Sequence, residues 1–175
     1  MSCLASLLAP PANSGTGDQW IGPLVLNVGG KSVKLTIDSS SYAAGEEGSP
    51  PTFHMDSTSF VLAGDFDLNG DGKADENDKP SVDGEGKLRP NSLVNKKVLL
   101  HETEDDGGSL QNFVELPGLG QCAVLKGSVL TITRYKKTGK EVDRWSGTVS
   151  LKLKPEKGAN SLQVNGQFEC GVQPE

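Results

Sequence analysis

The strongest constraint on the fold is the alternation of apolar and polar residues in the last third of the chain. Three segments follow this pattern, 128–135, 144–154 and 162–168, and short turns separate them. A period of two is typical of β-strands that turn one face to a core, because successive side chains on a strand point to opposite faces. The pattern predicts a three-stranded antiparallel meander with Lys152 and Lys154 on its solvent face.

The rest of the chain also reads as short strands joined by turns. The 22 glycines and 10 prolines favour many turns, and no helical period is present. A hairpin is predicted around Gly29-Gly30, while residues 38–51 read as a loop. Further strands are expected at residues 24–28, 33–37, 58–63, 94–102 and 110–116. With about eight short strands, the fold class is all-β, an antiparallel β-sandwich with a barrel as second choice.

The chain of 175 residues fits a single β domain over 20–175, preceded by a tail over 1–19. The tail is small, polar and rich in glycine and proline after a short apolar start, which is typical of disorder. Three interpretations of its start stay open. In the first, Cys3 is the lipid anchor of a bacterial lipoprotein. In the second, the segment is the remnant of a signal peptide, and in the third it is a plain tail. No segment has the ~20 apolar residues of a transmembrane helix.

The charge distribution bounds the partners. The formal net charge is −6, so nucleic acid is not expected as a partner, because binding to phosphates needs a basic face. Acidic residues concentrate in 65–86 and 102–106, whereas 126–157 is rich in lysine. We interpret this basic stretch as the solvated faces of strands.

One segment carries the spacing of a calcium-binding loop. Counted from Asp67, oxygen-bearing side chains stand at positions 1, 3, 5, 9 and 12, and Gly72 stands at position 6, where the chain must turn sharply. Position 7 contributes a backbone carbonyl in such loops. The predicted Ca²⁺ ligands are Asp67, Asn69, Asp71, the carbonyl of Lys73, Asp75 and Asp78. Calcium is a hard cation that binds six to eight oxygens, which this loop supplies.

The sequence Asp-Leu-Asn-Gly-Asp-Gly at 67–72 resembles the calcium loops of dockerins and of integrin-type β-propeller repeats. The dockerin resemblance implies closure by the acid at position 12, Asp78, and a helix after the loop. The integrin resemblance implies that Asp75 at position 9 is the closing acid, between two strands. Residues 59–63 before the loop look like a strand, and Pro80 opposes a long helix after it. The resemblance covers about a dozen residues and occurs once in the chain.

A second register of the loop begins at Asp65 and ends at Glu76. We favour the register from Asp67, because it places an acid at positions 1, 5, 9 and 12. The remaining alternative is an acidic turn without metal, in which the carboxylates would repel one another. A single loop of this kind predicts a structural ion rather than a sensor. Calcium is plentiful outside cells, so the loop favours a secreted, periplasmic or outer-surface location.

Cys122 and Cys170 leave two alternatives open, a disulfide or two buried thiols. His54 and His101 have no catalytic motif around them, and Trp145 is expected to pack in the core rather than bind a sugar.

The sequence therefore predicts a non-enzymatic, calcium-binding surface or periplasmic module for binding or adhesion, with a protein or carbohydrate ligand. An architectural subunit of an extracellular or envelope assembly is the alternative. A hydrolase with an accessory calcium ion ranks third.

Overall fold

The described residues form one β-sheet of eleven strands. The computed structural model describes residues 22–45, 49–102, 112–137, 143–158 and 160–174, so the predictions for the tail and Cys3 lie outside the described residues. The strands are β1 (Gly22–Val28), β2 (Lys31–Ile37), β3 (Ser39–Ala43), β4 (Thr52–Ser57), β5 (Phe60–Asp67), β6 (Lys97–Leu100), β7 (Phe113–Leu116), β8 (Gly120–Val124), β9 (Val129–Lys136), β10 (Asp143–Pro155) and β11 (Leu162–Pro174).

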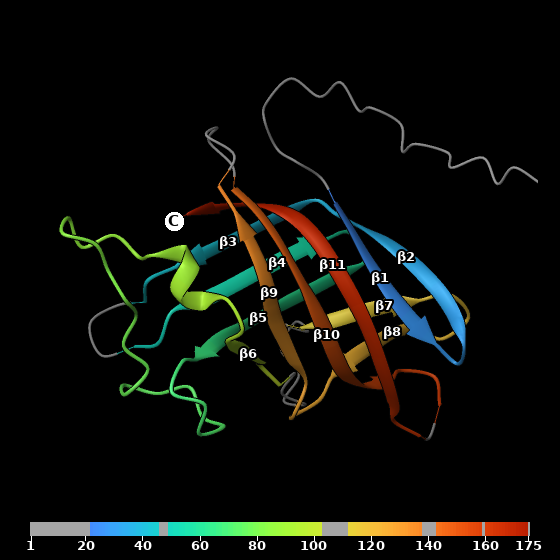
Figure 1. Cartoon of the computed structure of the whole chain (residues 1–175). Helices are drawn as coiled ribbons and strands as arrows, with labels where there is room; N and C mark the ends of the chain where they lie inside the picture. Colours follow the sequence, from blue (N-terminus) through green and yellow to red (C-terminus); the bar gives the residue numbers. More distant parts are fainter. Residues whose placement is uncertain (1–21, 46–48, 103–111, 138–142, 159, 175) are drawn as a thin grey trace, which may run out of the picture.

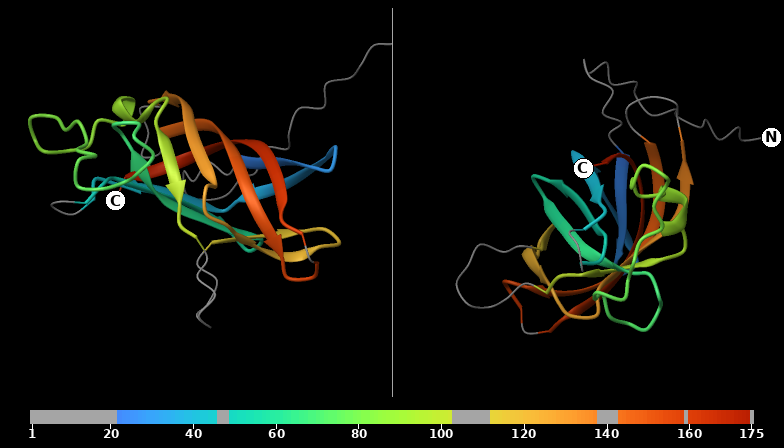
Figure 2. Two further views of the ribbon diagram at one scale, coloured as in Figure 1. Left: turned by 90° about the horizontal axis from the view of Figure 1, so that it is seen from below. Right: turned by 90° about the vertical axis from the view of Figure 1, so that its left-hand side faces the viewer.

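The strands form two layers that are joined at their edges. In Figure 1, β1, β9, β10 and β11 cross in front of β3, β4, β5 and β7. Pairings lead from β11 through β3, β4, β5, β6, β9 and β10 back to β11, and only the β11–β3 pair in this ring is parallel. The all-β prediction is confirmed, and the arrangement has both the facing layers of a sandwich and the closed pairing of a barrel. Figure 2 shows the strands around one interior, which a single apolar core fills.

The predicted hairpin and meander are both present. Strands β1 and β2 pair antiparallel from Gly22↔Ile37 to Val28↔Lys31. Strand β10 pairs antiparallel with β9 on one edge and with β11 on the other. Lys152 and Lys154 are exposed, while Val149 and Leu151 are buried. The alternation in this region therefore identified the core face correctly.

Strand β9 contains an irregularity that strict alternation of its residues does not predict. The β9–β10 register shifts between Ser146 and Gly147, so that Gly147 lies opposite Ile132 and Ser146 lies opposite Arg134. A Cβ at Gly147 would collide with the carbonyl oxygen of Thr131, so the close approach of the strands requires glycine here. This β-bulge leaves Thr133 outside the residue pairing of β9 and β10 and changes which residues of β9 face the core.

Three strands were missed from the sequence. Residues 38–51 were predicted as a loop, but β3 (Ser39–Ala43) lies there. Strands β4 (Thr52–Ser57) and β8 (Gly120–Val124) were also not expected. Strand β3 is Ser-Ser-Ser-Tyr-Ala, which shows little apolar alternation, although Ser40 and Tyr42 are buried. Pairing with β4 from Ser39↔Asp56 to Ala43↔Thr52 keeps this polar segment in the sheet. Tertiary pairing here outweighs local propensity.

Cys122 and Cys170 are free thiols and both are fully buried. Cys122 lies opposite Pro155 and Cys170 opposite Trp145, which places them at different ends of β10. Ten residues of strand separate these ends by roughly 30 Å, whereas a disulfide needs Cα atoms within about 7 Å. Of the two alternatives, the structure has the buried thiols. Burial raises the pKa of the Cys170 thiol to about 12 and also raises that of Cys122.

The connection between β5 and β6, residues 68–96, is the longest irregular segment of the described chain. Within the described ranges, its 3-10 helix η1 (Pro90–Leu93) is the only helix. This helix is not long and apolar enough to cross a membrane. Leu93 is fully buried, the Asn95 amide donates to the carbonyl of Ile132 (2.7 Å), and Lys96 Nζ donates to the carbonyl of Leu68. These contacts attach the end of the connection to the sheet (Figure 1, green).

Candidate metal site

The candidate calcium loop begins at the last residue of β5. Asp67 is only 3% exposed, and its carboxylate is turned into the loop. Its Oδ1 accepts from the Gly70 amide (2.7 Å) and its Oδ2 from the Gly72 amide (3.0 Å). Both glycines have positive φ, 83° and 85°, a conformation that other residues rarely adopt. The glycines therefore let the chain wrap around the first carboxylate.

The last residue of the loop, Asp78, holds the two ends together. It is 1% exposed, and its Oδ1 accepts from the amides of Leu68 (2.6 Å) and Asn69 (2.9 Å). Its Oδ2 accepts from the amide of Asp75 (2.9 Å). A carboxylate that accepts several amide bonds is held in one orientation, because such charge-assisted hydrogen bonds are strong. Positions 1 and 12 of the predicted loop are thus buried and adjacent to the same turn.

The middle of the loop is a series of turns capped by side chains. Asn69 Oδ1 accepts from the Asp71 amide (2.8 Å), and Asp71 Oδ1 accepts from the Lys73 amide (2.9 Å). Asp75 Oδ1 accepts from the amide and the side chain of Asn77, both at 2.9 Å. Each side chain bonds two residues ahead, the pattern of an Asx turn. The second oxygens of Asp71 and Asp75 accept no hydrogen bond from the described residues.

The structure places all six predicted ligands on one closed loop, but it does not gather their carboxylates around one point. Among the described residues, no three His, Cys, Asp or Glu side chains form a group that could hold a metal ion. Two of the six predicted ligand oxygens belong to the Asn69 side chain and the Lys73 carbonyl rather than to carboxylates. The buried carboxylates of Asp67 and Asp78 face backbone amides of the loop. Oδ1 of Asp78 accepts two amide bonds, but both oxygens of Asp67 and Oδ2 of Asp78 accept one each and retain a lone pair for a cation.

Two residues belong only to the second register, Asp65 before the loop and Glu76 within it. Asp65 is in β5 and its Oδ2 is 2.8 Å from Nε2 of His101. This hydrogen bond raises the pKa of His101, although partial burial of the ring opposes the change. Glu76 is exposed. The Asp65 carboxylate therefore contacts His101, and the Glu76 side chain is turned to solvent.

The two histidines lie on the outer face of the sheet. His54 is opposite Ala63 in the β4–β5 pair, and the His101 amide donates to the Ala63 carbonyl (3.0 Å) from the other side of β5. His54 Nε2 is 3.7 Å from Asp56. Trp145, by contrast, is fully buried, as expected, and packs against Tyr42, Phe53 and Tyr135.

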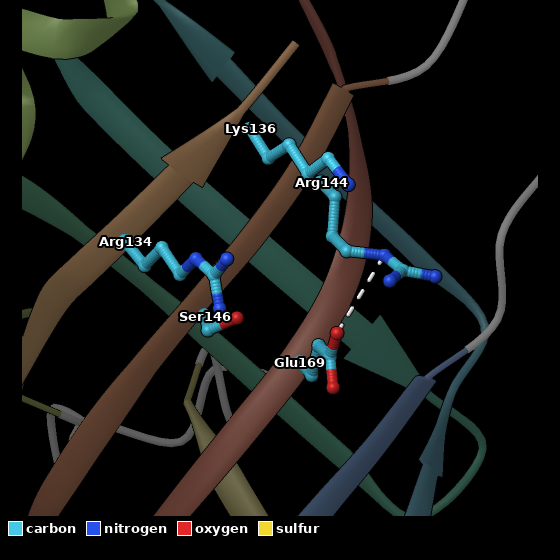
Figure 3. A pocket seen from close by; sticks show the side chains of 5 residues that line it. All are labelled: Arg134, Lys136, Arg144, Ser146 and Glu169. Atoms are coloured by element: carbon cyan, nitrogen blue, oxygen red, sulfur yellow. Dashed lines mark ion pairs between the residues drawn. The ribbon is translucent and has the colours of Figure 1, made fainter. Parts of the chain in front are cut away.

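The described surface also has a small hollow that the sequence analysis did not single out (Figure 3). Its volume is about 60 Å³, and it is lined by Arg134, Lys136, Arg144, Ser146 and Glu169. The sequence indicated only a lysine-rich stretch of solvated strands there. The clustering depends on the bulge in β9, whose signal in the sequence is the shift of the apolar side chains from Leu130 and Ile132 to Tyr135.

Comparisons of the chain with models of known protein families, with curated proteins and with solved structures found no match. The structure alone therefore defines the class of this protein, which is all-β with one long acidic connection. The residues of the loop and of the surface are the evidence for its function.

Proposed function

We propose that the loop Asp67–Asp78 binds one Ca²⁺ ion, and that the ion stabilises the β5–β6 connection of a non-enzymatic β protein. The observation that carries this proposal is the placement of Asp67 and Asp78, two buried carboxylates at the two ends of a loop with calcium-type spacing. Buried carboxylates are costly unless hydrogen bonds or a cation compensate them. Here the backbone amides supply the hydrogen bonds, and calcium would supply the charge.

The other ligands follow from the same geometry. Asn69 and Asp71 face the turn that Gly70 and Gly72 create, and Asp75 precedes the closing residue Asp78. With the Lys73 carbonyl at position 7, these residues supply the oxygens that calcium prefers. The carboxylates of Asp67, Asp71, Asp75 and Asp78 repel one another at neutral pH, and a divalent cation removes this repulsion.

The ion's role in this proposal is structural. The loop follows a strand, and no helix follows it before η1, so the helix pair of a calcium sensor is not formed by the described residues. A structural site can be weak where calcium is abundant, with dissociation constants of about 10⁻⁴–10⁻³ M in extracellular modules. This supports a secreted, periplasmic or outer-surface protein whose binding or adhesive role is exerted through the surface of the sheet.

The test is calorimetric titration of chelator-stripped protein with CaCl₂, with thermal melts in parallel. Asp71→Asn is the informative variant, because asparagine keeps an oxygen for the Lys73 amide and removes only the charge. Asp67→Asn tests position 1 in the same way. Asp83→Asn is the matched control, since Asp83 caps a similar turn through the amides of Glu85 and Lys87 but lies outside the loop.

We expect saturable binding in the wild type and in Asp83→Asn, and at least about tenfold weaker binding in the two loop variants. Saturating calcium at 100 times its dissociation constant would stabilise the fold by about 2.7 kcal/mol. If the wild type shows neither binding heat nor a calcium-dependent melting temperature, residues 67–78 form an acidic turn without metal, and the argument for an exported location fails with it.

A further inference from the structure

The basic hollow of Figure 3 lies on the outer face of the meander. Arg134 and Lys136 come from β9, Arg144 and Ser146 from β10, and Glu169 from β11. Their neighbours along the strands point inward: Trp145 and Cys170 are fully buried, and Tyr135 packs against Trp145. The five side chains therefore share one solvent-facing surface of three adjacent strands.

The register aligns these side chains in two rows across the strands. Lys136 lies directly opposite Arg144, and Arg134 lies opposite Ser146, which in turn lies opposite Glu169. Like charges in directly opposed positions destabilise a sheet. Lys136 and Arg144 thus repel each other, although Arg144 is also paired with Glu169, and an anion bound between the two basic side chains would offset this repulsion.

The bulge in β9 produces this arrangement. Leu130 and Ile132 face the core, and strict alternation would turn Arg134 and Lys136 inward as well. The extra residue Thr133 reverses the faces, so that Tyr135 turns inward and the two basic side chains are exposed. Bulges are common where a strand re-aims side chains at a binding site.

The charges of the hollow are not balanced. The chain carries a net charge of −6, yet three cations and one carboxylate meet here. Glu169 Oε1 is 3.5 Å from Nε of Arg144 and offsets one of the three positive charges. Neither Arg134 nor Lys136 forms an ion pair with any residue in the described part of the chain. The hollow therefore keeps an excess of positive charge.

The size and the donors of the hollow indicate the chemistry of its ligand. A volume of about 60 Å³ is several times the roughly 10–15 Å³ that one water molecule needs by the same measure, so the hollow has room for one small anion. Arginine presents a planar fork of N–H donors that matches an oxyanion, and lysine adds a point charge. The Ser146 hydroxyl is a further donor between the strands.

We propose that this hollow binds a tetrahedral oxyanion group, sulfate or phosphate, through Arg134, Lys136 and Arg144 with Ser146 as a neutral donor. The group fits as a free ion or as the charged substituent of a larger ligand, because the hollow opens to solvent on the strand face. This site is separate from the proposed calcium loop and does not depend on calcium binding.

The test is a titration of the isotope-labelled full chain with sodium sulfate and with sodium phosphate, at ionic strength held constant with sodium chloride. Backbone amide and arginine Nε shifts are followed by nuclear magnetic resonance. We expect saturable shifts at Arg134, Arg144 and Ser146 with at least one of the two anions. Saturation by sulfate alone, by phosphate alone or by both supports the site and identifies the group that it prefers.

The variants separate a site from general attraction. Arg134→Gln/Lys136→Gln is expected to weaken binding at least about tenfold, because two charge-assisted contacts are lost. Lys152→Gln/Lys154→Gln removes the same charge from the same face of β10 outside the hollow, and we expect it to leave the affinity within about twofold. Glu169→Gln removes the competing carboxylate and is expected to tighten binding a few-fold.

Linear shifts that equal those produced by chloride would overturn the proposal. Equal weakening in both double variants would overturn it too, because the attraction would then come from the overall charge. Weaker binding in Glu169→Gln would also contradict it. The amide spectra of the variants report whether each is folded, so a loss of binding is not confused with a loss of structure.

Discussion

The meander of β9, β10 and β11 and the β5–β6 connection are stabilised in opposite ways. In the meander, backbone pairs run from Asp143↔Val172 to Leu153↔Leu162 on one edge of β10, and alternate side chains enter the core. In the connection, residues 68–78 form no strand, and the hydrogen bonds run from backbone amides to the side chains of Asp67, Asn69, Asp71, Asp75 and Asp78.

The difference concerns what each region needs from its side chains. A strand satisfies its backbone groups through the neighbouring strand, so its side chains are free to be apolar and to pack. A loop without a ladder needs polar side chains as partners, and the acids that cap it here also accumulate negative charge. The stability of the meander should therefore be insensitive to calcium and sensitive to cavities, whereas that of the connection should depend on calcium and little on cavities.

The largest expected effect is that of Trp145→Ala in the meander. Trp145 is fully buried, with ring centroids 5.1 Å from Tyr42 and 6.1 Å from Phe53. Removing the indole leaves a cavity and should lower the free energy of unfolding by about 3–5 kcal/mol in calcium and in chelator alike. Denaturant unfolding measures it. Thr148→Ala, on the exposed face of β10, is the control and should change stability by less than about 0.5 kcal/mol.

A second variant at the same residue sharpens this result. Trp145 Nε1 is buried without a hydrogen-bond partner among the described residues, so the indole N–H contributes no favourable contact. Trp145→Phe should therefore cost clearly less than Trp145→Ala. A cost as large as that of alanine would mean that the N–H has a partner, and the packing account of this residue would be wrong.

An intermediate effect is expected for Asp78→Ala in the connection. The amides of Leu68, Asn69 and Asp75 lose their acceptor, which costs about 1–3 kcal/mol at a buried site. The loss should be local, because the loop contributes little to the core. Amide hydrogen exchange should accelerate at Leu68 and Asn69, and the slow exchange of strand amides such as Val149 should remain.

The control for this experiment is Asp83→Ala, which removes a turn cap at an exposed position of the same connection. It should leave the amides of Leu68 and Asn69 protected. Chelation of calcium from the wild type should reproduce the pattern of Asp78→Ala. Uniform acceleration in both regions would contradict the comparison, since the loop would then be part of the cooperative core.

The same contrast explains what the sequence could and could not predict. Val149, Leu151 and Leu153 alternate with polar residues, so the core face of β10 follows from the pattern alone. Strand β3 has no such pattern, and its parallel pairing at Gln173↔Ser41 and Pro174↔Tyr42 closes the ring between distant segments. Such a contact depends on the whole fold, so neither the strand nor the closure could be predicted locally.

The two candidate sites, the calcium loop and the basic hollow, also differ in how far the sequence predicted them. The spacing of Asp67, Asn69, Asp71, Asp75 and Asp78 identified them as one loop, because a tight turn allows few spacings. Spacing does not fix rotamers, and the structure turns Asp67 and Asp78 toward backbone amides. The basic hollow was missed because the bulge at Thr133 sets the faces of Arg134 and Lys136. The alternation marks this bulge only by the shift from Leu130 and Ile132 to Tyr135, and a single aromatic residue does not fix the face of a strand.

The smallest expected effect is that of the Asp65–His101 pair, in which Asp65 belongs to β5 and His101 directly follows β6. The hydrogen bond from Asp65 raises the pKa of His101 above the ordinary value of 6.5. The stabilisation is therefore complete below about pH 6.5 and is lost as the pH rises through the pKa of the folded state. The two side chains are 46% and 29% exposed, so solvent screening keeps the effect below about 1 kcal/mol.

Urea midpoints at pH 5.5 and 8.0 should differ less in His101→Gln than in the wild type, while His54→Gln, the control, should retain the wild-type difference. If calcium lowers the His101 pKa measured by proton resonance, Asp65 is a ligand and the register from Asp67 is wrong; an unchanged pKa keeps Asp65 in the sheet and outside the loop.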